Sequence, residues 1–112
     1  MLKYEGELDL VFQALADPTR RAIVDQLSKG PASVSELAQP LPMSMPAVHQ
    51  HLAVLEASGL VRSKKIGRVR TCHLEPKMLN TAQHWIEVRR DIWMRRLDRL
   101  DAYLASLPPE VP

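Results

Sequence analysis

A helix start followed by a short basic hairpin, within residues 44–74, limits the possible folds more than any other feature of the chain. The helical part begins at Ser44, a residue type favoured at helix N-termini, and stops at Gly59. Residues 61–74 then change to two strand-like runs around Gly67-Arg68, and a two-residue loop led by glycine suits a hairpin turn. A helix that fits a DNA major groove, joined to a basic β-arm, predicts a winged helix-turn-helix fold.

The turn also predicts which residues of this hairpin, the wing, lie opposite each other. The expected pairs are Ile66/Val69, Lys65/Arg70, Ser63/Cys72 and Val61/Leu74. Like charges directly opposite each other destabilise a free hairpin, and Lys65 and Arg70 form such a pair. A polyanion near the wing would relieve this repulsion.

The charge along the chain is concentrated where a DNA-binding surface is expected. The whole chain has a net charge of +2. Residues 1–43 carry four basic and six acidic side chains, and therefore a charge of −2. Residues 44–74 carry five basic side chains against Glu56 alone, and therefore a charge of +4. A solvated basic face is the alternative interpretation, which the neighbouring helix makes less attractive.

Two helices are predicted before this segment. The first is amphipathic, because four apolar residues have helical spacing: Leu8, Val11, Phe12 and Leu15. Asp17 caps the second helix, whose first position is Pro18, where a missing N–H costs nothing. Gly30-Pro31 ends this second helix.

A short third helix and a turn come next. Ser33 and Glu36 have the spacing of a capping box, which opens the helix. Its expected buried face consists of Val34, Leu37, Ala38 and Leu41. Because Pro40 removes a helical hydrogen bond, we expect the helix to end or distort near Gln39. Residues 40–43 then form the turn that leads into the helix after Ser44.

Helical geometry divides the helix after Ser44 into two faces. The inward stripe is apolar and consists of Val48, Leu52 and Leu55. The opposite face consists of Pro46, Gln50 and Ala53. Gln50 is the first candidate for a base contact, since its amide can pair bidentately with adenine, and a solvated glutamine is the alternative. His49 is the second candidate, Ala47 could contact a thymine methyl, and Val54 is expected to pack against a neighbouring helix.

The other expected contacts are mostly to phosphate. Ser44 can contact phosphate through its hydroxyl and the helix N-terminus. For His51, a packed histidine that orients the helix and a DNA contact are equally compatible with the sequence. The wing cations are expected to govern affinity and salt dependence. The predicted DNA-binding residues are Ser44, Met45, Ala47, His49, Gln50, His51, Arg62, Lys64, Lys65, Arg68 and Arg70.

The longest predicted helix covers residues 76–106 and carries a coiled-coil-like seam. From Trp93, apolar residues follow at spacings of four, three, four and three. One small domain can hardly cover both this seam and a face with Trp85 and Ile92, so a dimer interface is favoured over packing against the chain's own core. Its predicted residues on this helix are Ile86, Trp93, Leu97, Leu100 and Leu104.

Several functional classes are disfavoured. The one cysteine, Cys72, forms no disulfide within the chain and is most simply a small core residue. Neither a signal peptide nor a run long enough to span a bilayer is present, so we expect a cytoplasmic protein. Without a Gly-rich phosphate loop, a nucleophile elbow or a metalloprotease motif, we expect neither an enzyme nor a cofactor.

Over residues 8–105 the chain resembles the ArsR/SmtB family of bacterial transcriptional repressors. The strings ALADPTRRAI and PAVHQHLAVLEASGLV carry the resemblance, and their combination is specific. It implies a homodimer that pairs through its first and last helices, binds a pseudo-palindromic operator and usually releases it on a signal. Leu8, Val11 and Phe12 therefore join the predicted dimer interface. The chain departs from the family pattern at Pro40, Pro42 and His49.

Two alternatives accompany this interpretation. Many members of the family sense metals through cysteines on the third helix, which has none here, or through residues on the last helix. There, His84, Glu87 and Asp91 lie on roughly one face, and a charged solvent face is favoured because a tight site needs more nitrogen or sulfur ligands. We therefore expect no metal. A winged protein-interaction module that does not bind DNA is the second alternative, and the basic wing argues against it.

The sequence thus predicts one domain over residues 1–107, mainly α with a small β-hairpin wing and five helices, in a homodimer. Residues 33–58 form the helix-turn-helix, residues 61–74 the wing, residues 76–106 the dimerisation helix and residues 108–112 a flexible tail. The expected function is sequence-specific DNA binding, as a repressor of an operator close to the chain's own gene with an unknown effector.

Overall fold

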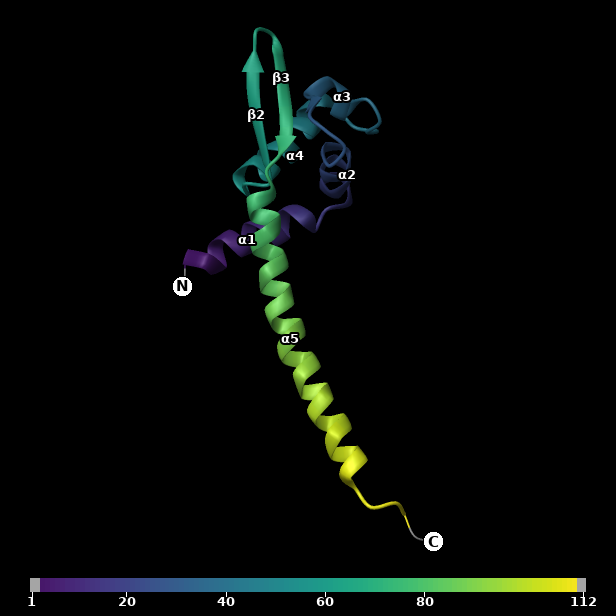
Figure 1. The fold of residues 1–112 in the computed structure, drawn as a ribbon. Coiled ribbons are helices and arrows are strands. Elements are labelled where there is room, and N and C mark those ends of the chain that lie inside the picture. Colours follow the sequence, from purple (N-terminus) through teal and green to yellow (C-terminus); the bar gives the residue numbers. More distant parts are fainter. Residues whose placement is uncertain (1–2, 111–112) are drawn as a thin grey trace. The chain divides into compact units, whose positions relative to one another are not determined.

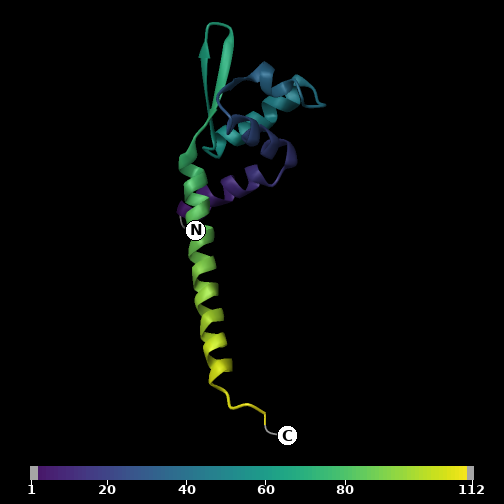
Figure 2. The same ribbon diagram turned by 45° about the vertical axis from the view of Figure 1, so that its right-hand side comes forward.

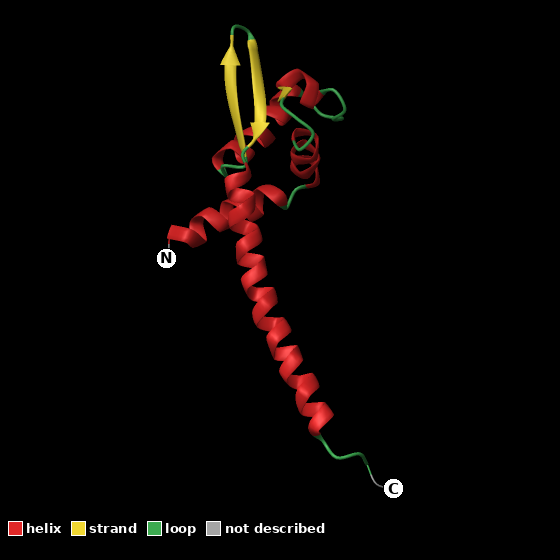
Figure 3. Cartoon of the chain, viewed as in Figure 1, coloured by secondary structure: helices red, strands yellow, loops and turns green. Residues whose placement is uncertain are grey.

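Five helices and three short strands make up the structure, a computed structural model that describes residues 3–110 (Figure 1). They are α1 (Lys3–Leu15), α2 (Pro18–Leu27), β1 (Ala32–Ser33), α3 (Val34–Ala38), α4 (Met45–Ala57), β2 (Val61–Ile66), β3 (Val69–Leu74) and α5 (Pro76–Ser106). Helices predominate, and the strands form one small sheet (Figure 3). The predicted class, mainly α with a hairpin wing, is confirmed. The chain divides after Ala82 into two compact units, and the single domain over residues 1–107 stays a prediction.

The wing has the predicted register. Lys65 pairs with Arg70 and Ser63 with Cys72, as the two-residue turn requires. Gly67 has a φ of 63°, whereas Arg68, like every other described residue except glycine, has no positive φ. A positive φ at the first turn position alone is typical of a type II′ turn, whose twist matches that of the strands. Figures 1 and 2 show β2 and β3 side by side, with this turn at the free end of the arm.

The third strand was not predicted. β1 pairs antiparallel with β3, with Ala32 opposite Cys72 and Ser33 opposite Thr71, so the sheet has the order β1-β3-β2. A strand of two residues offers no alternating pattern that could be detected in the sequence. Its effect is to attach the base of the wing to the start of α3.

Side-chain caps begin three helices where the sequence predicts them. The Asp17 carboxylate accepts a hydrogen bond from the Arg20 backbone N–H at 3.0 Å. Ser33 and Glu36 form the complete capping box, with both hydrogen bonds at 3.1 Å. The Ser44 hydroxyl accepts from the Ala47 N–H at 3.4 Å. These three caps confirm the predicted helix starts.

α3 ends at Ala38, with Gln39 as its C-cap, as Pro40 predicts. Leu41 therefore lies outside the helix, and its assignment to the buried helical face is wrong in that respect. It is half-buried and packs against the core from the turn between α3 and α4.

The core of the first unit takes side chains from every element that surrounds α4. Its buried members are Val11, Ala14, Ile23, Val24, Leu27, Ala32, Val34, Leu37, Val48, Leu52, Leu55, Leu60, Val61, Cys72 and Ala82. Cys72 is fully buried, which confirms its assignment as a core residue. Val11 is also fully buried within its own chain, so its side chain offers no surface to a second chain. Its assignment to the dimer interface is thereby corrected, because α1 turns this residue towards the core.

The predicted faces of α4 are largely confirmed. Val48 and Leu55 are 0% exposed and Leu52 is 4% exposed, whereas the opposite face is open. Val54 is 38% exposed, so the expectation that it packs against a neighbouring helix is wrong. One residue before Leu55, it points far enough from the apolar stripe to reach solvent.

In the second unit, residues 83–106 continue α5 as a regular helix with half-exposed apolar side chains. Trp93 is 59%, Leu100 50% and Leu104 55% exposed. Residues 108–110 lie outside regular structure, and residues 111–112 of the predicted tail lie outside the described residues. Within residues 3–110, no helix combines the length and the apolar character that a membrane crossing needs.

Replacing Leu55 by alanine should lower the free energy of unfolding by about 2–5 kcal/mol, because the change leaves a cavity in a fully buried site. Val54→Ala is the matched control, since the adjacent side chain is exposed, and should cost less than about 1 kcal/mol. Urea unfolding of both variants measures the difference. Equal losses would show that the inward stripe of α4 does not determine stability.

Candidate nucleic-acid interface

The outward face of α4 presents the side chains that were predicted to contact bases. Gln50 and His49 are exposed, as are Ser44 and Met45 at the N-terminal end of the helix. Ala47 is half-buried. Because the opposite stripe is locked in the core, these side chains are held at the surface by packing and need no contacts of their own.

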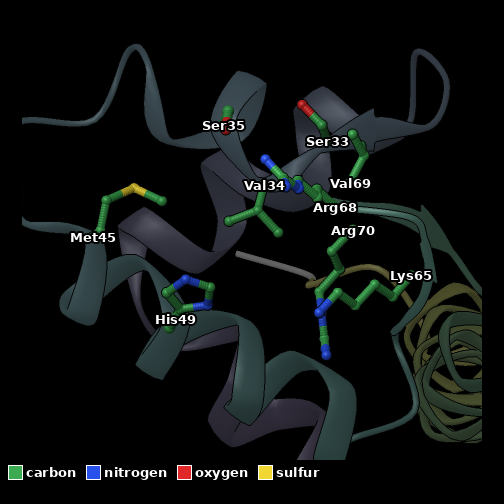
Figure 4. A pocket seen from close by; sticks show the side chains of 9 residues that line it. All are labelled: Ser33, Val34, Ser35, Met45, His49, Lys65, Arg68, Val69 and Arg70. Atoms are coloured by element: carbon green, nitrogen blue, oxygen red, sulfur yellow. The ribbon is translucent and has the colours of Figure 1, made fainter.

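A groove with a volume of about 380 Å³ separates this face of α4 from the wing (Figure 4). In Figure 4, Met45 and His49 of α4 lie on one side, and Lys65 and Arg70 of the wing lie on the other. The residues that line it are Ser33, Val34, Ser35, Met45, His49, Lys65, Arg68, Val69 and Arg70. No carboxylate is among them. The groove therefore joins hydroxyl groups, a histidine and three cations on one surface.

Four residues that line this groove were not predicted as site residues: Ser33 of β1, Val34 and Ser35 of α3, and Val69 of β3. Ser33 and Val34 line it because β1 attaches the start of α3 to β3, and no pattern in the sequence indicates that strand. Ser35 is exposed, and its hydroxyl forms no hydrogen bond within the described part of the chain. The capping box, which places Ser35 in the first turn of a helix, was the one available signal.

The five wing cations fall into two groups. Arg62 Nε lies 3.5 Å from Glu75 Oε2, and Arg70 Nη1 lies 3.9 Å from Glu56 Oε1. Lys64, Lys65 and Arg68 are exposed and form no ion pair within residues 6–110. Of the five wing cations, these three therefore have no carboxylate partner in the described part of the chain, so their full charge can act on an external anion.

The Lys65/Arg70 pair is thus explained without a polyanion. Glu56 lies beside Arg70 and supplies a negative charge within the chain, which reduces the repulsion across the strands. The pair by itself is accordingly no evidence for DNA, in contrast to the argument from the sequence.

His51 lies against the N-terminus of α2. Its Nδ1 is 3.3 Å from Arg20 Nη1 and 3.8 Å from Asp17 Oδ2. The ring of His51 therefore faces a guanidinium of α2 and the carboxylate that caps this helix. This is the arrangement expected of a packed histidine that orients α4.

Arg20 connects this histidine to α1. Its Nε donates to the Ala14 carbonyl at 2.8 Å, and its Nη2 donates to the Gln13 carbonyl at 2.9 Å. The neighbouring Arg21 donates to the Leu15 carbonyl at 2.7 Å. The two arginines therefore donate to three carbonyls in the last turn of α1, where the helix itself leaves carbonyl groups without an i+4 donor. In this way the ADPTRR segment ties α1, α2 and α4 together.

Two titratable groups near the interface have shifted pKa values. The Arg20 backbone N–H lowers the pKa of Asp17; desolvation opposes this shift, and the charges of His51 and Arg20 add to it. Burial raises the pKa of the Cys72 thiol, and the Glu56 charge adds to the rise. A protonated thiol is a poor nucleophile, so the shift agrees with a structural role for Cys72. Among the described residues, no group of three His, Cys, Asp or Glu side chains is placed to hold a metal ion.

An exposed helix face, a hairpin with unpaired cations and a groove between them define the interface of a winged helix-turn-helix protein. Residues 15–64 match the family description "Helix-turn-helix domain". Over 68 residues, the chain is 53% identical to the HTH-type transcriptional regulator Rv2034 of Mycobacterium tuberculosis, covering 61% of this chain and 64% of that protein. The match thus spans less than two thirds of that relative's length.

Two further comparisons cover more of both chains. The arsenical resistance operon repressor of Escherichia coli is 33% identical over 87% of this chain and 81% of its own length. The crystal structure of an ArsR family transcriptional regulator superimposes with a TM-score of 0.79, at 46% identity over 84% of this chain and 97% of that one. The chain belongs to the ArsR family of transcriptional regulators, a family of DNA-binding proteins and not of enzymes. This confirms the resemblance and the expectation that the chain is not an enzyme.

Asp17→Asn should destabilise the protein at neutral pH, because the amide keeps the cap but loses the charge that interacts with Arg20 and His51. The folded-state pKa of Asp17 lies below its ordinary value of 3.8, so the carboxylate stabilises above that value and its contribution is lost as the pH falls below it. The difference in unfolding free energy between the two proteins should therefore shrink in acid. Urea unfolding at several pH values measures it.

Asp25→Asn is the control for this measurement, since Asp25 is exposed on the same helix. It should change stability little at any pH. An Asp17→Asn defect of constant size down to acid pH would contradict the electrostatic role of the cap.

Proposed function

We propose that this ArsR family regulator acts as a homodimeric repressor of a pseudo-palindromic operator close to its own gene. The observation that carries the proposal is the shared groove, which Met45 and His49 of α4 border on one side. Its cations come from the wing: Lys65, Arg68 and Arg70. A helix in the major groove and an adjacent wing on the phosphate backbone would use both borders at once. The name of the Escherichia coli relative, a repressor, supports repression.

Within this proposal, the side chains have distinct roles. Gln50 reads a base edge, with His49 and Ala47 beside it on α4. Ser44 and Met45, at the N-terminus of α4, contact the sugar-phosphate backbone of the DNA. The main phosphate contacts come from the three wing cations without an internal partner, Lys64, Lys65 and Arg68. Arg62 and Arg70 contribute less, because each shares its charge with a carboxylate, and His51 orients α4 from behind.

The dimer is proposed to form through α5. Apolar side chains at alternating spacings of four and three leave a seam on this helix, and they are half-exposed in the single chain. On α1, Leu8 is half-buried and Phe12 is 38% exposed, so both retain surface that a second chain could cover. The interface is accordingly proposed to consist of Leu8, Phe12, Ile86, Trp93, Leu97, Leu100 and Leu104. The location is proposed to be the cytoplasm.

Selection from a randomised pool of DNA duplexes tests the proposal directly. The unmodified chain should enrich sequences with two inverted half-sites about 10 base pairs apart, one helical turn, as two-fold symmetry demands. Enrichment of single, unpaired half-sites would contradict the dimer, and no enrichment at all would contradict sequence-specific binding.

Gln50→Ala should reduce discrimination among variants of the selected duplex by roughly 1–3 kcal/mol at one position in each half-site, because the bidentate contact is lost. Binding titrations against single-base variants measure the effect. Arg68→Ala is the contrasting variant, since loss of a phosphate contact should weaken all sequences alike. If Gln50→Ala also weakens every sequence equally, Gln50 is not the base-reading residue.

Trp93→Glu should convert the dimer to monomers, because it places a charge in the middle of the apolar seam. Sedimentation velocity over a range of concentrations measures the association. Ala102→Glu is the matched control, since it adds the same charge to the face of α5 opposite the seam. An intact dimer with Trp93→Glu, or dissociation with Ala102→Glu as well, would place the interface elsewhere.

A further inference from the structure

Glu56 is the one acidic residue among residues 44–74, and it lies at an unfavourable place in its helix. It belongs to the last turn of α4, where the negative end of the helix dipole disfavours a carboxylate. It also adds a negative charge to a segment that is proposed to bind a polyanion. Neither helix stability nor attraction for DNA explains a glutamate at this position, but its side-chain contacts do.

Those contacts connect α4 with both strands of the wing. The Ser63 hydroxyl of β2 donates a hydrogen bond to Glu56 Oε1. Arg70 of β3 donates to the Ser63 Oγ at 3.2 Å, and its Nη1 lies 3.9 Å from the same Glu56 oxygen. One carboxylate, one hydroxyl and one guanidinium therefore form a closed triangle over three elements.

The triangle lies between the buried base of the hairpin and its turn. Ser63 is opposite Cys72, and Arg70 is two residues nearer to the turn on the same face. At the base of this face, Val61 and Cys72 are buried in the core. Beyond Arg70, towards the turn, no hydrogen bond or ion pair joins the wing to α4 in the described part of the chain. The triangle is thus the outermost polar attachment of the wing.

We propose that Glu56 is a positioning residue for DNA binding, which fixes the wing relative to α4 through Ser63 and Arg70. This inference rests on the proposed function. Its consequence is that the unpaired cations nearer the tip, above all Lys65 and Arg68, reach phosphate while the outward face of α4 occupies the major groove. Arg70 then acts within the protein, as the link to Glu56, instead of as an independent phosphate contact.

Glu56→Gln separates positioning from simple electrostatics, because the two predict opposite signs. Removing a negative charge near bound DNA should strengthen binding if charge alone matters. If the glutamate positions the wing, binding should weaken by roughly tenfold, a size within the usual range for coupled contacts. The dependence of the binding constant on salt should also become shallower, since a misplaced wing neutralises fewer phosphates.

The measurement is a salt series of binding titrations with the full chain and the duplex selected by the unmodified protein. Arg68→Ala calibrates the change of salt slope that follows the loss of one wing cation. Asp25→Asn is the charge-matched control, because it removes one negative charge from an exposed position on α2, and it should not weaken binding. Binding by Glu56→Gln that equals or exceeds that of the unmodified chain overturns the inference.

A double-mutant cycle provides the second test. With positioning, Glu56→Gln and Arg70→Gln break the same attachment, so the double variant should bind about as well as either single variant. Additive losses would show that Arg70 acts alone on DNA, and would overturn the inference. Ser63→Ala removes only a hydroxyl and should weaken binding in the same direction. Thermal unfolding of each variant restricts the comparison to folded protein, and Ser63→Ala decides the matter should Glu56→Gln not fold.

The outcomes also separate this inference from the proposed function. If the unmodified chain selects no duplex, the proposed function fails and the inference fails with it. If the unmodified chain binds but Glu56→Gln and Ser63→Ala bind equally well, only the positioning role is overturned.

Discussion

The packing of one apolar stripe on α4 is the constraint on which the rest of the structure depends. Val48, Leu52 and Leu55 are almost completely buried, so the rotation of the helix about its axis is fixed by the core. Rotation by even one residue would move the apolar stripe into solvent at a cost of several kcal/mol (roughly 25 cal/mol for each Å² of apolar surface). The direction in which the outward face points, with Gln50 on it, is therefore fixed by the core, although none of its side chains is buried.

The sequence predicted the parts of the fold that are determined locally. Helix caps at Asp17, Ser33 and Ser44 depend on contacts over three residues, and the wing register depends on a two-residue turn, so both can be derived from short patterns. β1 could not be derived, because its two residues are extended only through pairing with β3. For the same reason the α3 side of the groove, with Ser33 and Ser35, was missed.

Long-range ion pairs were the other part that the sequence did not show. A count of charges in the wing treats all five cations as equivalent, whereas Glu56 and Glu75 engage Arg70 and Arg62. Glu56 precedes the wing and Glu75 follows it, and only the folded hairpin places each beside its arginine. Likewise, His51 could not be assigned from its position on α4, because its partners are Arg20 of α2 and the N-cap residue Asp17, some thirty residues earlier in the chain.

These ion pairs separate the basic residues of the wing into two that are paired within the chain and three that are not. A cation paired within the chain loses part of its attraction for phosphate, since its field is partly cancelled at short range. The same pairing gives it a fixed direction, which a long flexible side chain on an exposed strand otherwise lacks and could gain only at an entropic cost on binding. A wing built from free cations alone would have the stronger attraction for DNA and the weaker geometry. Arg70 is held by Glu56 near the turn end of β3, whereas Lys64, Lys65 and Arg68 are left unpaired. Under the proposed function, orientation and attraction would therefore belong to different residues, so that each could be altered without abolishing the other.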